Sequence, residues 1–159
     1  GSGPRHLVFS PDGLQAYATL ELSAQVARFD HVDGSLVQRQ LVDMAAEGDT
    51  AKHSPGAIHL SPDGRLLYAS DRAETNRIMV YAIEENANLR EIQARDSEGR
   101  EPREFAIDPS GRFMLIANQK SDALVVVQRD PDSGLLGDTL QTLPMSRPSD
   151  LKFIDRSAR

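Results

Sequence analysis

One motif recurs along this chain at nearly constant spacing. Pro4–Gly13 reads PRHLVFSPDG, Pro55–Gly64 reads PGAIHLSPDG, Pro102–Gly111 reads PREFAIDPSG, and Pro148–Asp155 resembles the start of a fourth copy. The first prolines of successive copies are 51, 47 and 46 residues apart. A fixed period of this size is the signature of a repeat architecture, in which each unit is one supersecondary element. The chain therefore has to fold as a series of similar units.

Each unit contains short segments rich in β-forming residues and separated by Gly, Pro and Asp turns. Strands are expected at residues 6–9, 16–21, 25–30 and 36–42, then at 66–70, 77–84 and 89–94, then at 113–118, 123–129 and 139–143. Four antiparallel strands per unit predict an all-β chain of β-propeller blades, with a β-sandwich or a β-solenoid as alternatives.

The whole chain, 1–159, is expected to form one partial propeller domain. Its blade units are 4–54, 55–101 and 102–147, and 148–155 is the closing strand of a fourth blade. A closed propeller has at least four blades, so the chain is expected to be part of a larger ring.

Composition excludes several classes of protein. There is no Cys, which removes disulfide scaffolds and thiolate metal sites. With 18 Lys and Arg against 24 Asp and Glu, the net charge of −6 argues against a nucleic-acid partner. No apolar run approaches the roughly 20 residues of a membrane span, and the start has no signal-peptide pattern. We therefore expect no membrane partner and a cytoplasmic location.

Counting from the first turn of each unit brings a set of polar residues to one rim. The equivalent positions hold Arg5, Gly56 and Arg103 at the start of the first strand, and Glu21, Arg72 and Gln119 at the end of the second. In an antiparallel hairpin, the start of the first strand and the end of the second strand both lie opposite the turn. Arginine forks suit a carboxylate or phosphate, and a nearby glutamate suits general base catalysis. The alternative is a solvated rim of ion pairs.

The histidines point less clearly to chemistry. His6 is expected on the opposite face of its sheet from Arg5, because side chains alternate along a strand. His59 is expected to be packed on its inner strand, and His31 and His53 fall in polar connecting segments. The sequence has no phosphate loop, dinucleotide glycine pattern, Gly-x-Ser-x-Gly or His-x-x-x-His. A covalent serine mechanism has no support, and neither a metal nor another cofactor is expected.

Three segments resemble a known family. Gly3–Gly13, Ser61–Arg72 and, most specifically, Pro102–Arg112 followed by Ala117-Asn118-Gln119 are similar to the lactonase family of seven-bladed β-propellers. This family includes the propeller-type 6-phosphogluconolactonases and, more distantly, carboxy-cis,cis-muconate cyclase. The resemblance covers nearly the whole chain and matches the C-terminal half of the family's ring.

The resemblance implies hydrolysis of a small anionic sugar lactone once the ring is complete. It implies catalytic roles for Arg5, Glu21 and Arg72. We expect a second set of residues to contact the substrate, namely His6, Arg103, Asn118 and Gln119. A histidine that relatives supply from an earlier blade has no counterpart here.

The chain departs from the family pattern at three positions, where Leu20 and Asp71 replace Asn and Ala57 replaces an acidic residue. Two other functions stay open. One is a non-catalytic assembly or binding module whose ring is closed by a homodimer or a complementing chain. The other is a muconate-type cyclase or isomerase.

Overall fold

A computed structural model describes residues 1–154 as three antiparallel sheets of four strands each. Blade 1 contains β1 (Pro4–Phe9), β2 (Gln15–Leu20), β3 (Gln25–Val32) and β4 (Ser35–Asp43). Blade 2 contains β5 (Pro55–Leu60), β6 (Leu66–Asp71), β7 (Arg77–Ile83) and β8 (Leu89–Asp96). Blade 3 contains β9 (Pro102–Ile107), β10 (Phe113–Asn118), β11 (Ala123–Arg129) and β12 (Leu136–Pro144), with a short 3₁₀ turn, η1 (Gln119–Ser121).

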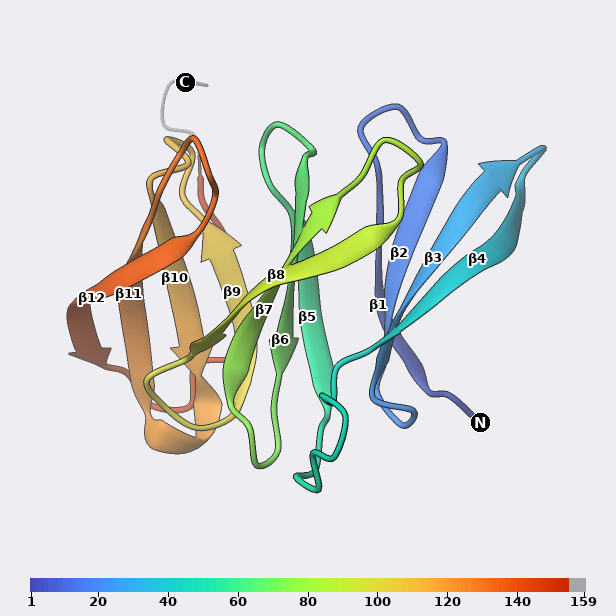
Figure 1. Ribbon diagram of the computed structural model, residues 1–159. Helices are drawn as coiled ribbons and strands as arrows, with labels where there is room; N and C mark the ends of the chain where they lie inside the picture. The colour runs from blue at the N-terminus through green and yellow to red at the C-terminus, as the bar shows by residue number, and fades with distance from the viewer. Residues whose placement is uncertain (155–159) are drawn as a thin grey trace.

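Every sheet follows chain order, so each strand pairs with the next one along the sequence. The three sheets stand side by side, and the first strands β1, β5 and β9 are neighbours across the blades (Figure 1). The predicted four-stranded units are confirmed. No helix in residues 1–154 has the length and apolar character needed to cross a membrane.

One detail of the prediction is wrong: His31 lies in β3 and not in a connecting segment. Residues 148–154 form no strand with the three sheets, and Asp155 lies outside the described residues, so the closing strand of a fourth blade stays a prediction. A strand needs a partner for its backbone N–H and C=O groups, and no strand of the three sheets pairs with 148–154.

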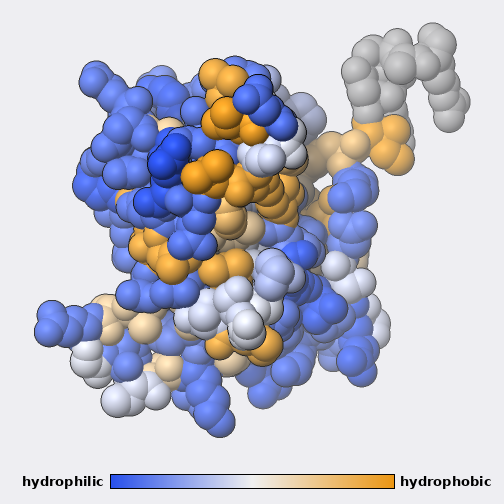
Figure 2. Space-filling view, turned by 90° about the vertical axis from the view of Figure 1, so that its right-hand side faces the viewer, coloured by the Kyte–Doolittle hydropathy of each residue, from blue (hydrophilic) through white to orange (hydrophobic). Residues whose placement is uncertain are grey.

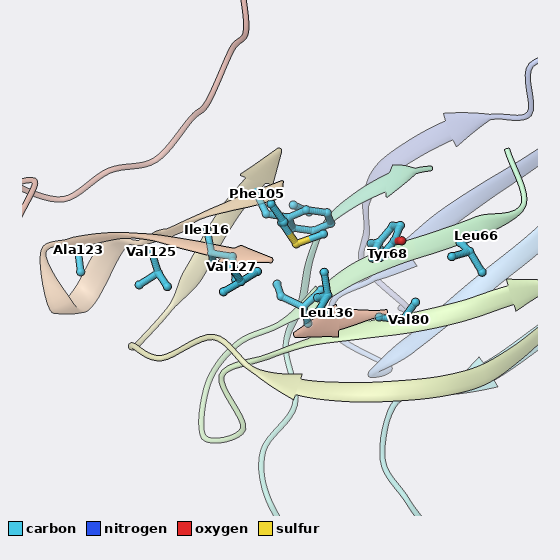
Figure 3. Packing of buried hydrophobic residues seen from close by; sticks show 12 residues of the cluster. Leu66, Tyr68, Val80, Phe105, Ile116, Ala123, Val125, Val127 and Leu136 are labelled. Atoms are coloured by element: carbon cyan, nitrogen blue, oxygen red, sulfur yellow. The ribbon is translucent and has the colours of Figure 1, made fainter. Parts of the chain in front are cut away.

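The core lies between the blades and is divided into two clusters. Side chains such as Tyr17, Val26, Leu67 and Met79 join blade 1 to blade 2. Leu66, Tyr68, Phe105, Ile116, Val127 and Leu136 join blade 2 to blade 3, where they fill the space between the sheets (Figure 3). Successive residues of β6 point to opposite clusters, because strand side chains alternate between the two faces. Blade 2 is therefore packed on both faces, and every residue of β6 is buried.

Both joints between blades use the same polar contacts. The Gln40 amide accepts from Leu89 N–H at 2.7 Å and donates to Leu89 C=O at 3.0 Å. The Gln93 amide makes the same pair of bonds to Leu136, both at 2.8 Å. The repeat therefore specifies how one blade docks on the next as well as how each blade folds.

The two outer faces of this arc have no neighbouring blade. Leu7, Phe9 and Leu41 are exposed on blade 1, and Leu140, Leu143 and Met145 are exposed on blade 3. Figure 2 looks onto the blade 1 side, where apolar side chains gather on the surface. Faces of this kind in repeat proteins are normally covered by another repeat.

Candidate functional site

The rim positions found by counting are structurally equivalent. The backbone N–H of Glu21 donates to Gly3 C=O, and that of Arg72 donates to Ser54 C=O, at 2.8 and 3.1 Å. In blade 3 the N–H of Gln119 donates to Glu101 C=O at 2.9 Å. The same bond thus closes the open end of each first hairpin, and Glu21, Arg72 and Gln119 emerge at the same level of each blade.

Alternating charges connect the three blades along this rim. One carboxylate oxygen of Glu21 lies 3.7 Å from Arg5 Nε, and the other lies 2.5 Å from Arg72 Nη2. Arg72 Nη1 reaches Glu101 at 3.0 Å, and Glu101 in turn holds Lys120 Nζ at 3.2 Å. We call these five residues the rim ion chain. Because each carboxylate lies between two cations, the rim ion chain fixes the orientation of the side chains at its Arg5 end.

Arg72 is the central member of the rim ion chain and only 3% of its side chain is exposed. Its Nε donates to Ser54 C=O at 3.1 Å and its Nη2 to Ser54 Oγ at 2.9 Å. A side chain at Gly56 would come within 3.0 Å of Arg72 Nε and 2.5 Å of Ser70 Oγ, so glycine is required there. The guanidinium N–H groups of Arg72 therefore donate to other protein groups, and Arg72 holds Glu21 in position.

Glu21 is held as a carboxylate. Partial burial favours its neutral form, but the hydrogen bonds from Arg72 and Ser54 and the charges of Arg72 and Arg5 outweigh burial and lower its pKa. A carboxylate with a lowered pKa is a weak proton acceptor. Its geometry suits it to orient the guanidinium of Arg5.

His6 corrects a prediction. It was expected on the opposite face from Arg5, but Arg5 Nη1 donates to His6 Nε2 at 3.1 Å. The pairing of β1 with β2 is irregular between Pro4 and Leu7, and an irregularity of this kind breaks the strict alternation of side chains. Burial and the charge of Arg5 lower the pKa of His6, so this imidazole is neutral at pH 7.

The remaining predicted substrate contacts lie in blade 3 and differ in accessibility. Arg103 is partly exposed and forms no ion pair with any residue in 1–154; its charge helps burial to lower the pKa of Arg5. Gln119 lines a polar cavity of about 310 Å³ together with Lys120 and Arg147. Asn118 is fully buried and donates to Ser97 C=O at 2.7 Å, so the structure places it inside the blade and away from the site surface.

His53 was missed because it stands in a connecting segment with no motif. Its side chain is buried, and Nδ1 donates to the fully buried Asp71 at 2.7 Å. The other oxygen of Asp71 accepts from Ser54 N–H at 3.0 Å. The pair thereby fixes Ser54, which contacts both Arg72 and Glu21. The only sequence signal was the position of Asp71 immediately before Arg72.

A second histidine pair spans blades 2 and 3. His59 Nε2 donates to Glu104 Oε1 at 2.7 Å, and its ring meets Phe105 edge-on at 4.9 Å. His59 was expected to be packed, but 41% of its side chain is exposed. Glu104 is largely buried; its hydrogen bonds from His59 and Phe105 N–H outweigh burial and lower its pKa. Within the described part of the chain, no group of three or more His, Asp or Glu side chains is arranged to hold a metal ion.

The sequence of this chain matches a known protein family. Residues 1–153 match the family described as "Lactonase, 7-bladed beta-propeller". The chain belongs to this lactonase family. The propeller fold and the family resemblance expected from the sequence are thereby confirmed, with three blades of the ring present in the described residues.

This lactonase-family chain is 39% identical to the 6-phosphogluconolactonase of Formosa agariphila over 160 residues, which cover 99% of this chain and 45% of that protein. It is 35% identical to the 6-phosphogluconolactonase of Erwinia tasmaniensis over 86% of this chain and 41% of the relative. The solved periplasmic gluconolactonase of Pseudomonas aeruginosa superposes with a TM-score of 0.94 at 50% identity, covering 98% of this chain and 43% of that one.

The chain thus spans less than half the length of the relatives that it matches. The Pseudomonas aeruginosa relative is a periplasmic protein, and the cytoplasmic location expected for this chain stays a prediction.

Proposed function

We propose that this chain supplies three blades and part of the active site of a hydrolase acting on small anionic sugar lactones. The observation that carries the proposal is the Arg5 end of the rim ion chain, where a guanidinium is held by Glu21 and contacts a neutral His6. The names of the relatives, 6-phosphogluconolactonase and gluconolactonase, support the same substrate class.

In the proposed reaction Arg5 donates to the lactone carbonyl. Its hydrogen bonds become stronger as negative charge develops on that oxygen in the tetrahedral intermediate, which is how an oxyanion site lowers the barrier. Glu21 and Arg72 keep Arg5 in place, so little reorganisation is needed during the reaction. Arg103 and Gln119 lie farther along the same rim, and we assign them to the anionic or hydroxyl end of the substrate.

Closure of the ring belongs to this proposal. The exposed apolar faces of blades 1 and 3 are covered by further blades, from a complementing chain or from a second copy. The hydrogen bonds from Leu89 N–H to Gln40 and from Leu136 N–H to Gln93 are the kind of polar contact expected between further blades. Light scattering measures the mass in solution. A mass near twice 17.5 kDa indicates two copies, and a mass of 17.5 kDa indicates a chain that needs other blades.

Activity is tested with glucono-1,5-lactone and its 6-phosphate. Two proteins are assayed: the chain itself, and a chimera in which it replaces the matching segment of the Pseudomonas aeruginosa gluconolactonase. Arg5→Ala in the active protein is expected to lower kcat at least about 100-fold, the usual loss when one oxyanion donor is removed. Arg39→Ala is the matched control, because Arg39 lies on the outer strand β4, pairs with Asp30 of β3 and is outside the rim.

Other outcomes would identify the alternatives. Turnover of carboxy-cis,cis-muconate without lactone hydrolysis would assign a cyclase or isomerase. A closed ring without turnover of either substrate would assign a non-catalytic module. An unchanged rate in Arg5→Ala would remove Arg5 from the site.

A further inference from the structure

His59 and Glu104 are arranged like a catalytic dyad, and neither takes part in the proposed binding of the lactone by Arg5. Glu104 Oε1 accepts from His59 Nε2 at 2.7 Å and from Phe105 N–H at 2.9 Å. The carboxylate is therefore fixed from two sides, and the ring of His59 is held against Phe105. Nδ1 of His59 makes no hydrogen bond to any residue in 1–154, and the side chain is 41% exposed.

This arrangement determines which nitrogen of His59 carries the proton. A hydrogen bond from one imidazole nitrogen to a carboxylate places the proton on that nitrogen and leaves the other as an acceptor. Here Nε2 carries the proton, and Nδ1 keeps a lone pair that can accept a proton. A buried carboxylate that orients an imidazole is the pattern used to activate a nucleophile or a water molecule.

The pair lies next to the Arg5 end of the rim ion chain. His59 is on β5, which neighbours β1, the strand that carries Arg5 and His6. The charges of both Glu104 and His59 act on His6, and His6 contacts Arg5. The oxyanion donor and the open imidazole nitrogen thus lie on adjacent inner strands of blades 1 and 2.

We infer that His59 is the general base of the lactonase site and that Glu104 is its positioning residue. This inference rests on the proposed function and deepens it. Glu21 does not fill the role, since Arg72, Arg5 and Ser54 already occupy its oxygens. In this mechanism Arg5 stabilises the negative charge on the carbonyl oxygen, and His59 accepts the proton from water.

The step balances without a further reactant. Water attacks the lactone carbonyl carbon while His59 Nδ1 takes one of its protons, and the carbonyl oxygen becomes an alkoxide facing Arg5. When the alkoxide collapses, the bond from the former carbonyl carbon to the ring oxygen breaks. The imidazolium returns its proton to that oxygen, which leaves a hydroxy acid. Lactone and water are consumed, and His59 ends as it began.

Chemical rescue tests this role. In the active protein, His59→Ala is expected to lower kcat by about 100-fold or more, within the range for loss of a general base. Added imidazole is expected to restore at least about a tenth of the wild-type rate, because the vacated site is open to solvent. His31→Ala is the matched control, since His31 lies in β3 with Nδ1 bonded to Gly13 C=O. Glu104→Gln should lower kcat more than it changes KM.

The outcomes separate this inference from the proposed function. If the wild type hydrolyses the lactone and His59→Ala keeps full kcat, the base assignment is wrong and the lactonase proposal stands. A folded His59→Ala variant that is inactive and not rescued by imidazole also overturns it. If the wild type hydrolyses neither lactone, both proposals fall together. Nitrogen NMR of the imidazole checks the dyad itself, which requires Nε2–H in the wild type and loss of that preference in Glu104→Gln.

Discussion

Blades 1 and 2 share one repeat and differ in what surrounds them. Blade 2 packs against a sheet on each face, and β6 is buried throughout. Blade 1 packs on one face only, and its first strand β1 leaves Leu7 and Phe9 exposed. The local sequence specifies four strands in both cases. The neighbouring blades decide whether an apolar position becomes core, so equivalent substitutions should have unequal effects.

The largest expected difference is between Tyr68 and Phe9. Tyr68 is fully buried, its hydroxyl donates to Gly134 C=O at 2.7 Å, and Arg129 Nε donates to the same hydroxyl at 2.8 Å. Tyr68→Ala should cost about 3–5 kcal/mol of unfolding free energy, as large aromatic deletions in cores do. Phe9 is 46% exposed, so Phe9→Ala should cost about 1 kcal/mol or less. Urea denaturation measures both, and equal losses would show that blade 1 is buried in solution.

The next difference concerns two hairpin glycines in the left-handed region. Gly134, with φ +71°, follows β11 and faces blade 2, where an added Cβ would lie 1.9 Å from Leu66 Cδ1. Gly34, with φ +76°, turns the hairpin of blade 1 and has no atom within 4 Å of that position. Gly34→Ala should cost about 1 kcal/mol for backbone conformation alone.

Gly134→Ala should add about 1–3 kcal/mol for overpacking. The same urea titrations compare the two variants, with the wild type as reference. Similar losses in both would mean that the hairpin of blade 3 does not press against blade 2.

The smallest difference concerns acid stability of the first turns. In blade 2, burial is outweighed by hydrogen bonds from Ser61 and from Arg65, which lower the pKa of Asp63 to about 2. In blade 1, the pKa of Asp12 is lowered by Ser10 and Leu14 N–H, without an arginine partner. A lowered pKa in the folded state adds stability above the unfolded pKa and loses it as pH falls.

Between pH 4 and 2, Asp63→Asn should therefore flatten the acid-induced loss of stability more than Asp12→Asn does. Urea midpoints at pH 6 and at pH 3 for both variants provide the measurement. A steeper dependence on Asp12 would reverse the comparison.

Much of the fold follows from the repeat alone. The Pro-Asp-Gly and Pro-Ser-Gly turns set each first hairpin, and the hairpin register brings Glu21, Arg72 and Gln119 to one level. Both features depend only on contacts between residues close in the chain. The exception is the irregular start of β1, where His6 lies on the same side as Arg5.

The chemistry of the site depended on contacts between blades. By itself the sequence determined three four-stranded units and the residues on their rim, because turns and alternation act over a few residues. Only the tertiary structure joined His59 to Glu104, 45 residues apart, and showed that Asp71 holds His53 and Ser54. These pairs depend on how neighbouring blades and their connecting segment pack, and no local period records that packing.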